Sequence, residues 1–349
     1  RARRQRFTKD LDAAGLGNLA LTTNTGCFMT MLLAGETVSG ALLQSLAPGL
    51  HSRTEVDVVD TWGPGVRGKA GARGRLMRQI DKRNAGKRIV EAVAQLKPSA
   101  VLIIKGRGVD ASSINAVRAM GVPVACYYPD NPWWTREQEP EAFERLLACD
   151  LAITFSHWQA TKLSKLGANT AVLPFGYDPR WFPLQDPSSE RDGIVFLGTW
   201  SHRRQRFLAE LVDLPFPLVV HGTGWDSQDE VPSGPPITES GAGNLLGKAV
   251  VGVNLLHPQC AESHNMRTRE ITASGALQLS DPGADGSPLV DGQSFRVFKS
   301  PAHLRELVIE AFEDRENARA VAAEGQRVTA GETYFARGSQ LFDLMQGLA

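Results

Sequence analysis

The sequence predicts an α/β fold of two Rossmann-like, doubly wound domains that face each other across a cleft. Short runs rich in Val, Ile and Leu alternate with segments of helical periodicity along most of the 349 residues. This alternation is typical of parallel sheets covered by helices on both faces. A stretch with three prolines and no periodicity, 177–193, interrupts the alternation, which then starts again. A chain of this length can also hold two domains of ordinary size.

The first half of the chain contains the strands of the first predicted domain, residues 29–180. Its apolar runs are 31–36, 55–61, 100–106, 122–128, 150–156 and 170–176. A helix is predicted around Ala41–Leu46, and a second helix has Ile89 and Val93 on its apolar face and ends before Pro98.

Residues 181–192 are the predicted linker, and 193–330 are the second domain. The strands of that domain are predicted at 193–200, 217–222, 248–256 and 275–281. Ser300 and Pro301 have the chemistry of a helix start, and Gly325 is predicted to close that helix. A last helix, about 333–347 within the segment 331–349, is predicted to pack back on the first domain.

Composition excludes several classes of protein. Thirty-eight basic residues balance 38 acidic ones, so no global charge directs the chain to nucleic acid or to a membrane surface. The four cysteines are scattered, which disfavours a disulfide framework or a zinc site and favours a reducing, cytoplasmic location. No apolar run reaches the ~20 residues of a membrane span.

Two basic segments lie outside this pattern. Residues 1–28 are predicted to be an extension to the fold, from an extended reading frame or a cloning remnant, with a short docked helix as the alternative. Residues 67–88 are basic and rich in glycine. They are suited to an anionic acceptor surface or, as the more common case, to a solvated loop and helix face.

The segment 261–281, AESHNMRTREITASGALQLSD, concentrates polar side chains just before an apolar run. A helix from Asn265 to Gly275 would present free N–H groups and a positive dipole end to an anion. Glu270 would then lie about 7 Å along the helix at ~1.5 Å per residue, roughly the step from a pyrophosphate to the ribose of one nucleotide. Glu262, just before the helix, could accept hydrogen bonds from sugar hydroxyls. The spacing therefore suits a nucleoside diphosphate sugar.

Spacing alone favours a simpler interpretation of these acids. Two carboxylates eight positions apart occur by chance in many helices. Glu270 would then only pair with Arg267 or Arg269 at the helix surface.

The order of motifs around this segment changes the balance. NMRTREITASGALQLSD is followed by LVDGQSFRVFKSPAHLRELV, and IVFLGTWSHRRQRFLAEL opens the second domain, after CYYPDNPWW in the first. In this order the chain, over roughly 29–345, resembles a GT-B glycosyltransferase of the spore-maturation-protein (CgeB-like) group, with the E-x7-E motif of retaining enzymes. The resemblance implies a GT-B fold with the acceptor on the side of the first domain and the nucleotide sugar in the second.

The resemblance also implies roles for individual residues. Glu270 matches the family's ribose-binding Glu, and Glu262 matches the Glu that contacts the donor sugar. The basic residue near the pyrophosphate corresponds to Arg204 or to its neighbour Arg203. The family's additional lysine is missing, because Gln205 and Arg206 follow, and Arg267 or Lys248 could contribute instead.

The other candidate donor contacts lie near the helix tip and near two strand ends. His264 and Asn265, followed by Met266, would meet the phosphates, or Asn265 would simply cap the helix beside a surface histidine. Gly198 ends the first strand of the second domain. Gly222 lies in HGTGW, which resembles the family's loop near the base.

In the first domain the segment YYPDNPWW ends the fourth strand. Asp130 could contact the donor or orient an acceptor hydroxyl, or form an Asx-type turn before Pro132. Trp133 and Trp134 could stack on a sugar or be buried aromatics. Glu36 follows the first strand and is a second candidate acceptor contact.

These residues predict glycosyl transfer from a UDP- or GDP-sugar, with retention and without a metal or other cofactor, since no ligand spacing for a metal is visible. The acceptor stays open: a polysaccharide, lipid, protein, small molecule or nucleic acid. The alternatives are a nucleotide-sugar epimerase of the same architecture and a non-catalytic sugar-nucleotide binding protein.

Overall fold

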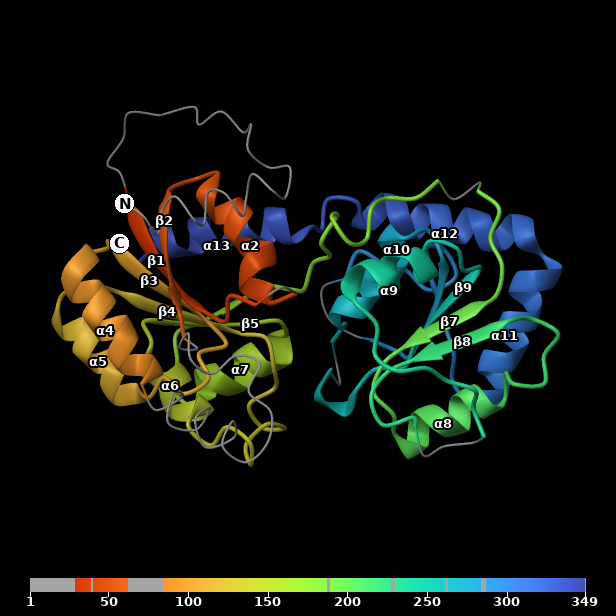
Figure 1. Cartoon of the computed structure of the whole chain (residues 1–349), viewed down its shortest axis with the longest axis horizontal. Coiled ribbons are helices and arrows are strands. Elements are labelled where there is room, and N and C mark those ends of the chain that lie inside the picture. Colours follow the sequence, from red (N-terminus) through yellow and green to blue (C-terminus); the bar gives the residue numbers. More distant parts are fainter. Residues whose placement is uncertain are drawn as a thin grey trace.

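The computed structural model describes residues 29–38, 40–61, 84–186, 189–226, 230–260, 263–283 and 287–348. They form two α/β domains that lie side by side (Figure 1). None of the helices in these ranges is long and apolar enough to cross a membrane.

The first domain is built on a parallel sheet with strand order β2-β1-β3-β4-β5-β6. Its strands lie within the predicted apolar runs, except that β1 begins one residue before its run: β1 (Thr30–Gly35), β2 (Glu55–Asp60), β3 (Ala100–Ile104), β4 (Val124–Tyr128), β5 (Leu151–Thr154) and β6 (Thr170–Val172). The helices between them are α2 (Leu42–His51), α4 (Ala85–Leu96), α5 (Ala111–Ala119), α6 (Ala142–Ala148) and α7 (His157–Lys165).

The second domain repeats this construction with strand order β11-β10-β9-β7-β8. Its strands are β7 (Ile194–Leu197), β8 (Leu218–His221), β9 (Val251–Asn254), β10 (Leu277–Ser280) and β11 (Arg296–Val297). Its helices are α8 (His202–Ala209), α9 (Glu239–Leu246), the short 3-10 turn η1 (Pro258–Cys260), α10 (Met266–Ala273), α11 (Pro301–Glu313) and α12 (Arg315–Thr329). The predicted doubly wound, two-domain fold is confirmed.

Each sheet is buried on both faces, as its apolar strands require. In β1, Leu32 packs toward the side of α4, α5 and α6, while Met31 and Leu33 pack toward α2 and the last helix, α13 (Tyr334–Gln346). The second sheet separates its helices in the same way, with α8 and α11 over one face and α9 and α10 over the other.

The chain crosses between the domains twice. Tyr177 bridges Thr333, so the outgoing and returning segments run side by side. After the second crossing α13 lies along α2 of the first domain (Figure 1). The helices approach closely because two glycines face each other: a Cβ on Gly49 would meet the carbonyl oxygen of Phe335 at 1.9 Å, and one on Gly338 would meet that of Leu46 at 2.2 Å. The core of the first domain therefore includes the end of the chain.

One predicted helix end is wrong. Ser300 caps α11 and Pro301 is its first residue, as predicted, but the helix ends at Glu313. Asp314 then caps α12 through the N–H of Asn317, and Gly325 lies inside that helix. The reason for a glycine there is packing, because a Cβ on Gly325 would lie 2.3 Å from the carbonyl oxygen of Ser294.

This contact leads to a stability prediction. Gly325→Ala is expected to lower the free energy of unfolding by about 1–3 kcal/mol, because the methyl group overpacks a backbone contact that cannot yield freely. Gly331→Ala is the matched control, since its Cβ would have nothing within 4 Å. Urea unfolding of both variants measures the difference, and equal midpoints would contradict the packing argument.

Candidate functional site

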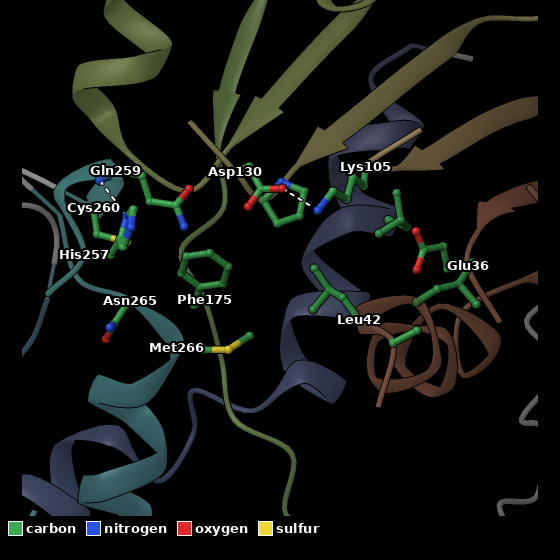
Figure 2. Close-up of a pocket in the computed structure, with 14 residues that line it drawn as sticks. Glu36, Leu42, Lys105, Asp130, Phe175, His257, Gln259, Cys260, Asn265 and Met266 are labelled. Carbon is green, nitrogen blue, oxygen red and sulfur yellow. Dashed lines mark hydrogen bonds and ion pairs between the residues drawn. The ribbon is translucent and has the colours of Figure 1, made fainter. Parts of the chain in front are cut away.

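A cavity of about 390 Å³ lies between the two domains at the carboxyl ends of their strands (Figure 2). The first domain contributes residues that follow β1, β3, β4 and β6, together with the start of α2. The second domain contributes the segment after β9 and the first residues of α10. Ligands of doubly wound folds bind at this edge of the sheet.

Helix α10 begins at the cavity. Asn265 is its N-cap, with its side-chain oxygen accepting a hydrogen bond from the N–H of Thr268 at 3.2 Å. The same side chain exchanges hydrogen bonds with Asn254 at the end of β9, which fixes the helix start against the sheet. Gly275 has φ 74° and follows the C-cap Ser274, so both predicted ends of this helix are confirmed.

The tip of α10 faces the cavity. Asn265 and Met266 line it, and Figure 2 shows Met266 extending from the helix start toward Phe175. The first N–H groups of a helix have no acceptor within the helix. Together with the dipole they make this tip suited to an anion.

Glu270 lies one turn further along α10 and is buried. Its Oε2 is 2.5 Å from Nη1 of Arg267, yet neither atom has a hydrogen-bond partner of normal geometry. Burial raises the pKa of Glu270, and the charge of Arg267 offsets this in part. The pairing with Arg267 that spacing alone favoured is thus present, but the Glu270 carboxylate is buried and does not lie at the helix surface.

Arg269 has a different partner. Its Nε donates to Glu332 at 2.9 Å, in the second crossing segment, and Glu332 also accepts from Arg337 of α13. Arg269 is therefore held away from Glu270. The network also ties α10 to the returning end of the chain.

Arg203 and Arg204, both in the first turn of α8, have different partners. Arg203 makes a two-fold ion pair with Asp281 at the end of β10. Arg204 donates to the carbonyl oxygens of Leu255 and Thr199, and within the described residues it has no carboxylate partner. Burial lowers the pKa of the Arg204 guanidinium, and the charge of Arg203 lowers it further.

Arg204 and the tip of α10 lie on either side of the end of β9. Arg204 holds Leu255, the residue after that strand, while Asn265 holds Asn254, its last residue. A guanidinium that has no ion-pair partner in the described part of the chain and a helix N-terminus thus lie beside the end of the same strand. This arrangement can stabilise a bound diphosphate.

Two residues predicted near the phosphates, His264 and Lys248, have surroundings that differ from those expected. The His264 ring is buried against Phe295, and a Cβ on Gly283 would lie 2.7 Å from it, so the interpretation as a surface histidine is wrong. Its backbone still adjoins the helix tip. Lys248 precedes β9 and lies at the opposite end of that strand from Asn254, so its predicted phosphate contact is wrong.

Gly198 and Gly222 serve close packing of the β7 and β8 ends. A Cβ on Gly222 would meet the carbonyl oxygen of Gly198 at 1.9 Å, and that oxygen also accepts a hydrogen bond from the indole of Trp225. A Cβ on Gly198 would lie 3.2 Å from Nη1 of Arg204. The glycines therefore leave room for the arginine at the strand end.

On the side of the first domain, Asp130 lines the cavity and pairs with Lys105, whose Nζ is 2.6 Å from Oδ2 (Figure 2). Lys105 follows β3 with φ 64°, in the left-handed region that non-glycine residues rarely adopt. The predicted Asx-type turn is formed by the next residue, Asn131, whose side chain accepts from the N–H of Trp133.

The loop after β4 also contacts the second domain. Asn131 donates to the carbonyl oxygen of Gln259 at 3.2 Å, and Trp134 meets the ring of His257 edge to face. Trp133 packs instead against Phe143 and Trp158 within its own domain. Trp134 is thus exposed at the rim of the cleft, whereas Trp133 is a structural aromatic.

A network of ion pairs and hydrogen bonds around Glu139 fixes the end of this loop that precedes α6. The Glu139 side chain is buried and accepts hydrogen bonds from Arg107, Arg145 and the hydroxyl of Tyr128. Leaving any partner of such a network unpaired would be costly. The loop that carries Asp130 is therefore fixed at both ends.

Sequence reasoning missed Lys105, Phe175, His257 and Cys260 as lining residues. Of these four, only Lys105 could have been identified from the sequence. It follows a predicted apolar strand directly, and parallel strands have their carboxyl ends at the same edge of a sheet, where the ligand binds. Burial lowers the pKa of His257, the charge of Arg204 lowers it further, and burial raises the pKa of the Cys260 thiol to about 12.

Glu262 and most of the basic stretch 67–88 lie outside the described residues, as do residues 1–28. Within the described ranges no group of three His, Cys, Asp or Glu side chains is arranged to hold a metal ion.

Comparisons with known proteins agree with this geometry. Residues 203–343, which include Arg203, Arg204 and all of α10, match the protein-family model described as glycosyl transferase-like. No curated protein matched the sequence. The family match supports glycosyltransferase activity at a general level.

Solved structures share the whole architecture. Sucrose-phosphate synthase from Thermosynechococcus elongatus superposes with a TM-score of 0.65 at 14% identity, over 92% of this chain and 99% of that one. The Anabaena protein HepE in complex with UDP-glucose gives 0.63 at 12% identity, over 92% and 100%. UDP-GlcNAc 2-epimerase from Neisseria meningitidis bound to UDP-GlcNAc gives 0.57 at 11%, over 92% and 100%. The chain has the GT-B fold.

Proposed function

We propose that the protein is a glycosyltransferase that moves a sugar from a nucleoside diphosphate sugar to an acceptor hydroxyl. One observation carries the proposal: the Arg204 guanidinium, without a carboxylate partner in the described part of the chain, lies beside the end of β9, where α10 presents its N-terminus. The leaving group of such a reaction is a diphosphate. Positive groups fixed before the reaction stabilise the charge that develops on it.

The donor lies across the tip of α10 in this proposal. The diphosphate contacts the first N–H groups of α10 and Arg204, and the ribose hydroxyls donate to Glu270. Arg203 contributes less because Asp281 already compensates its charge. Glu262, outside the described residues, contacts the donor sugar. Asp130 faces the donor from the other domain.

Three finer points belong to the same proposal. The donor is a UDP- or GDP-sugar, with UDP-glucose as the first probe because HepE was crystallised with it. Transfer proceeds with retention, as the E-x7-E resemblance implies, by attack on the face from which the diphosphate leaves. Arg204 and the helix tip supply the positive charge, so the reaction needs no metal.

The test is a thermal-shift screen of nucleotide sugars, followed by product analysis with the donor that stabilises the protein most. Binding raises the melting temperature by mass action. Release of the nucleoside diphosphate, in EDTA as well as in Mg²⁺, supports the proposal, and NMR of the anomeric proton reports retention or inversion. Failure of every nucleotide sugar to stabilise the protein would contradict it.

A nucleotide-sugar epimerase is the second candidate, favoured by the superposition on UDP-GlcNAc 2-epimerase. An epimerase converts its substrate without an acceptor. Incubation with the donor alone, followed by NMR of the sugar, tests this: a changed sugar configuration indicates an epimerase, and an unchanged configuration contradicts one.

A further inference from the structure

The wall that the first domain contributes to the cavity is mostly apolar. Its apolar lining residues are Ala41, Leu42, Leu43, Ile104, Pro129 and Phe175. Met266 reaches into the same space from α10, and Figure 2 shows its side chain together with those of Phe175 and Leu42 around the cavity. A volume of about 390 Å³ is near the lower end of the roughly 300–1,000 Å³ of small-molecule sites. The wall therefore suits the body of a small apolar molecule.

The charges of the cavity disfavour an anion on this side. Within the part of the chain that the structure describes, the charged side chains that line it are Glu36, Lys105 and Asp130. The positive charge of Lys105 is compensated by Asp130 at 2.6 Å, which leaves the carboxylate of Glu36 uncompensated among the lining residues. A carboxylate or phosphate on the acceptor would be repelled by Glu36, and among the described lining residues it would find no cation that is not already paired.

Asp130 is placed to engage an acceptor hydroxyl. Oδ2 of the Asp130 carboxylate pairs with Lys105. Lys105 has a left-handed backbone conformation at the end of β3, which places its side chain beside the end of β4. Oδ1 of Asp130 remains for a hydrogen bond from a ligand, at the border between the apolar wall and the second domain.

We propose that the acceptor is a small, uncharged alcohol or phenol whose apolar body packs against Leu42, Phe175 and Met266 and whose hydroxyl donates a hydrogen bond to Asp130. This inference rests on the proposed function. In the transfer step the acceptor oxygen bonds to the anomeric carbon. The bond from that carbon to the diphosphate breaks, its electron pair leaves with the diphosphate, and the hydroxyl proton passes to the Asp130 carboxylate.

A matched pair of acceptors tests the charge rule. The full chain, with the nucleotide sugar of the largest thermal shift, is given 7-hydroxycoumarin or 7-hydroxycoumarin-3-carboxylate, which differ by one carboxylate. The glycoside is measured by chromatography. We expect kcat/KM at least tenfold higher for the neutral phenol. Equal or greater transfer to the carboxylate, or transfer only to an acidic polysaccharide or a phosphorylated sugar, overturns the inference.

A matched pair of variants tests the apolar wall. Leu42 is half-buried beside the core of the first domain and is the first residue of α2, where the aspartate of Leu42→Asp suits the helix dipole. We expect it to lower transfer to 7-hydroxycoumarin at least tenfold while donor affinity stays unchanged. Leu166→Asp, at an exposed site after α7, is the control and should change neither quantity. Unchanged transfer in the Leu42 variant overturns the inference.

The two proposals fail in different ways. If a nucleotide sugar binds and is slowly hydrolysed by water, but neutral phenols and alcohols receive no sugar, the acceptor inference is wrong and the donor site stands. If no nucleotide sugar binds or is cleaved, the proposed function is wrong, and the acceptor inference that rests on it is wrong as well.

Discussion

Glu270→Gln is expected to weaken binding of the nucleotide sugar about 10- to 100-fold. Hydrogen bonds to a charged group contribute about 1.5–3 kcal/mol each, and 1.4 kcal/mol is a factor of ten in affinity. The buried carboxylate of Glu270, whose Oε2 pairs with Arg267, is the acceptor that the ribose hydroxyls would use. Calorimetric titration with the best donor measures the change.

The control for this variant is Glu306→Gln, which removes an exposed carboxylate on α11 and should leave affinity unchanged. An unaltered dissociation constant for the Glu270 variant would remove the ribose assignment and leave Glu270 as a structural partner of Arg267.

The pH dependence of binding gives an independent measurement of the same group. Burial raises the pKa of Glu270 in the free protein above its ordinary 4.5. Hydrogen bonds from ribose hydroxyls favour the carboxylate, so binding lowers this pKa and releases a proton. Affinity should therefore increase as the pH rises from about 4.5 through the raised pKa, and level off above it. Glu270→Gln should show a flat profile over this interval.

Arg204→Met is expected to lower kcat about 10²- to 10³-fold, the usual effect of removing one donor that stabilises a developing anion. The neighbouring arginine provides the comparison. Arg203 is already paired with Asp281, so Arg203→Met should cost stability more than turnover. Release of the nucleoside diphosphate gives kcat, and thermal unfolding gives stability.

Arg204→Lys separates charge from folding, because it retains a cation but loses the fork that holds Leu255. Partial recovery of kcat relative to the Met variant is expected. If both Met variants lost turnover equally, at equal melting temperatures, the distinction between the paired and the unpaired arginine would be wrong.

Local patterns in the sequence were sufficient for the fold. Apolar runs predicted the strands because both sheets are buried on both faces, and Asn265 and Gly275 predicted the ends of α10 because capping is local chemistry. Gly325 was wrongly predicted to end a helix, because its role depends on a contact with a distant segment. A glycine that permits a close contact within a helix looks, in one dimension, like a glycine that ends one.

The site depended on pairings that sequence cannot reveal. Arg203 and Arg204 are equivalent by pattern, and only the position of Asp281 at the end of β10 distinguishes them. Lys105 and Asp130 are 25 residues apart along the chain, and they meet because β3 and β4 are neighbours in the sheet. The burial of His264 depends on Phe295 and Gly283, which come from other loops. The positions of most candidate residues were thus predictable, whereas their partners were not.

The return of α13 to the first domain has a consequence for biosynthesis. Residues such as Leu341, Phe342 and Met345 complete the core that begins with Met31 and Leu33. A ribosome making roughly 5–20 residues per second reaches α13 about ten to thirty seconds after it has finished the first sheet. Until then α2 covers that face of the sheet without the helix that packs beside it. The domain made first is therefore completed last. The whole second domain has to leave the ribosome before α13 can complete the core of the first domain.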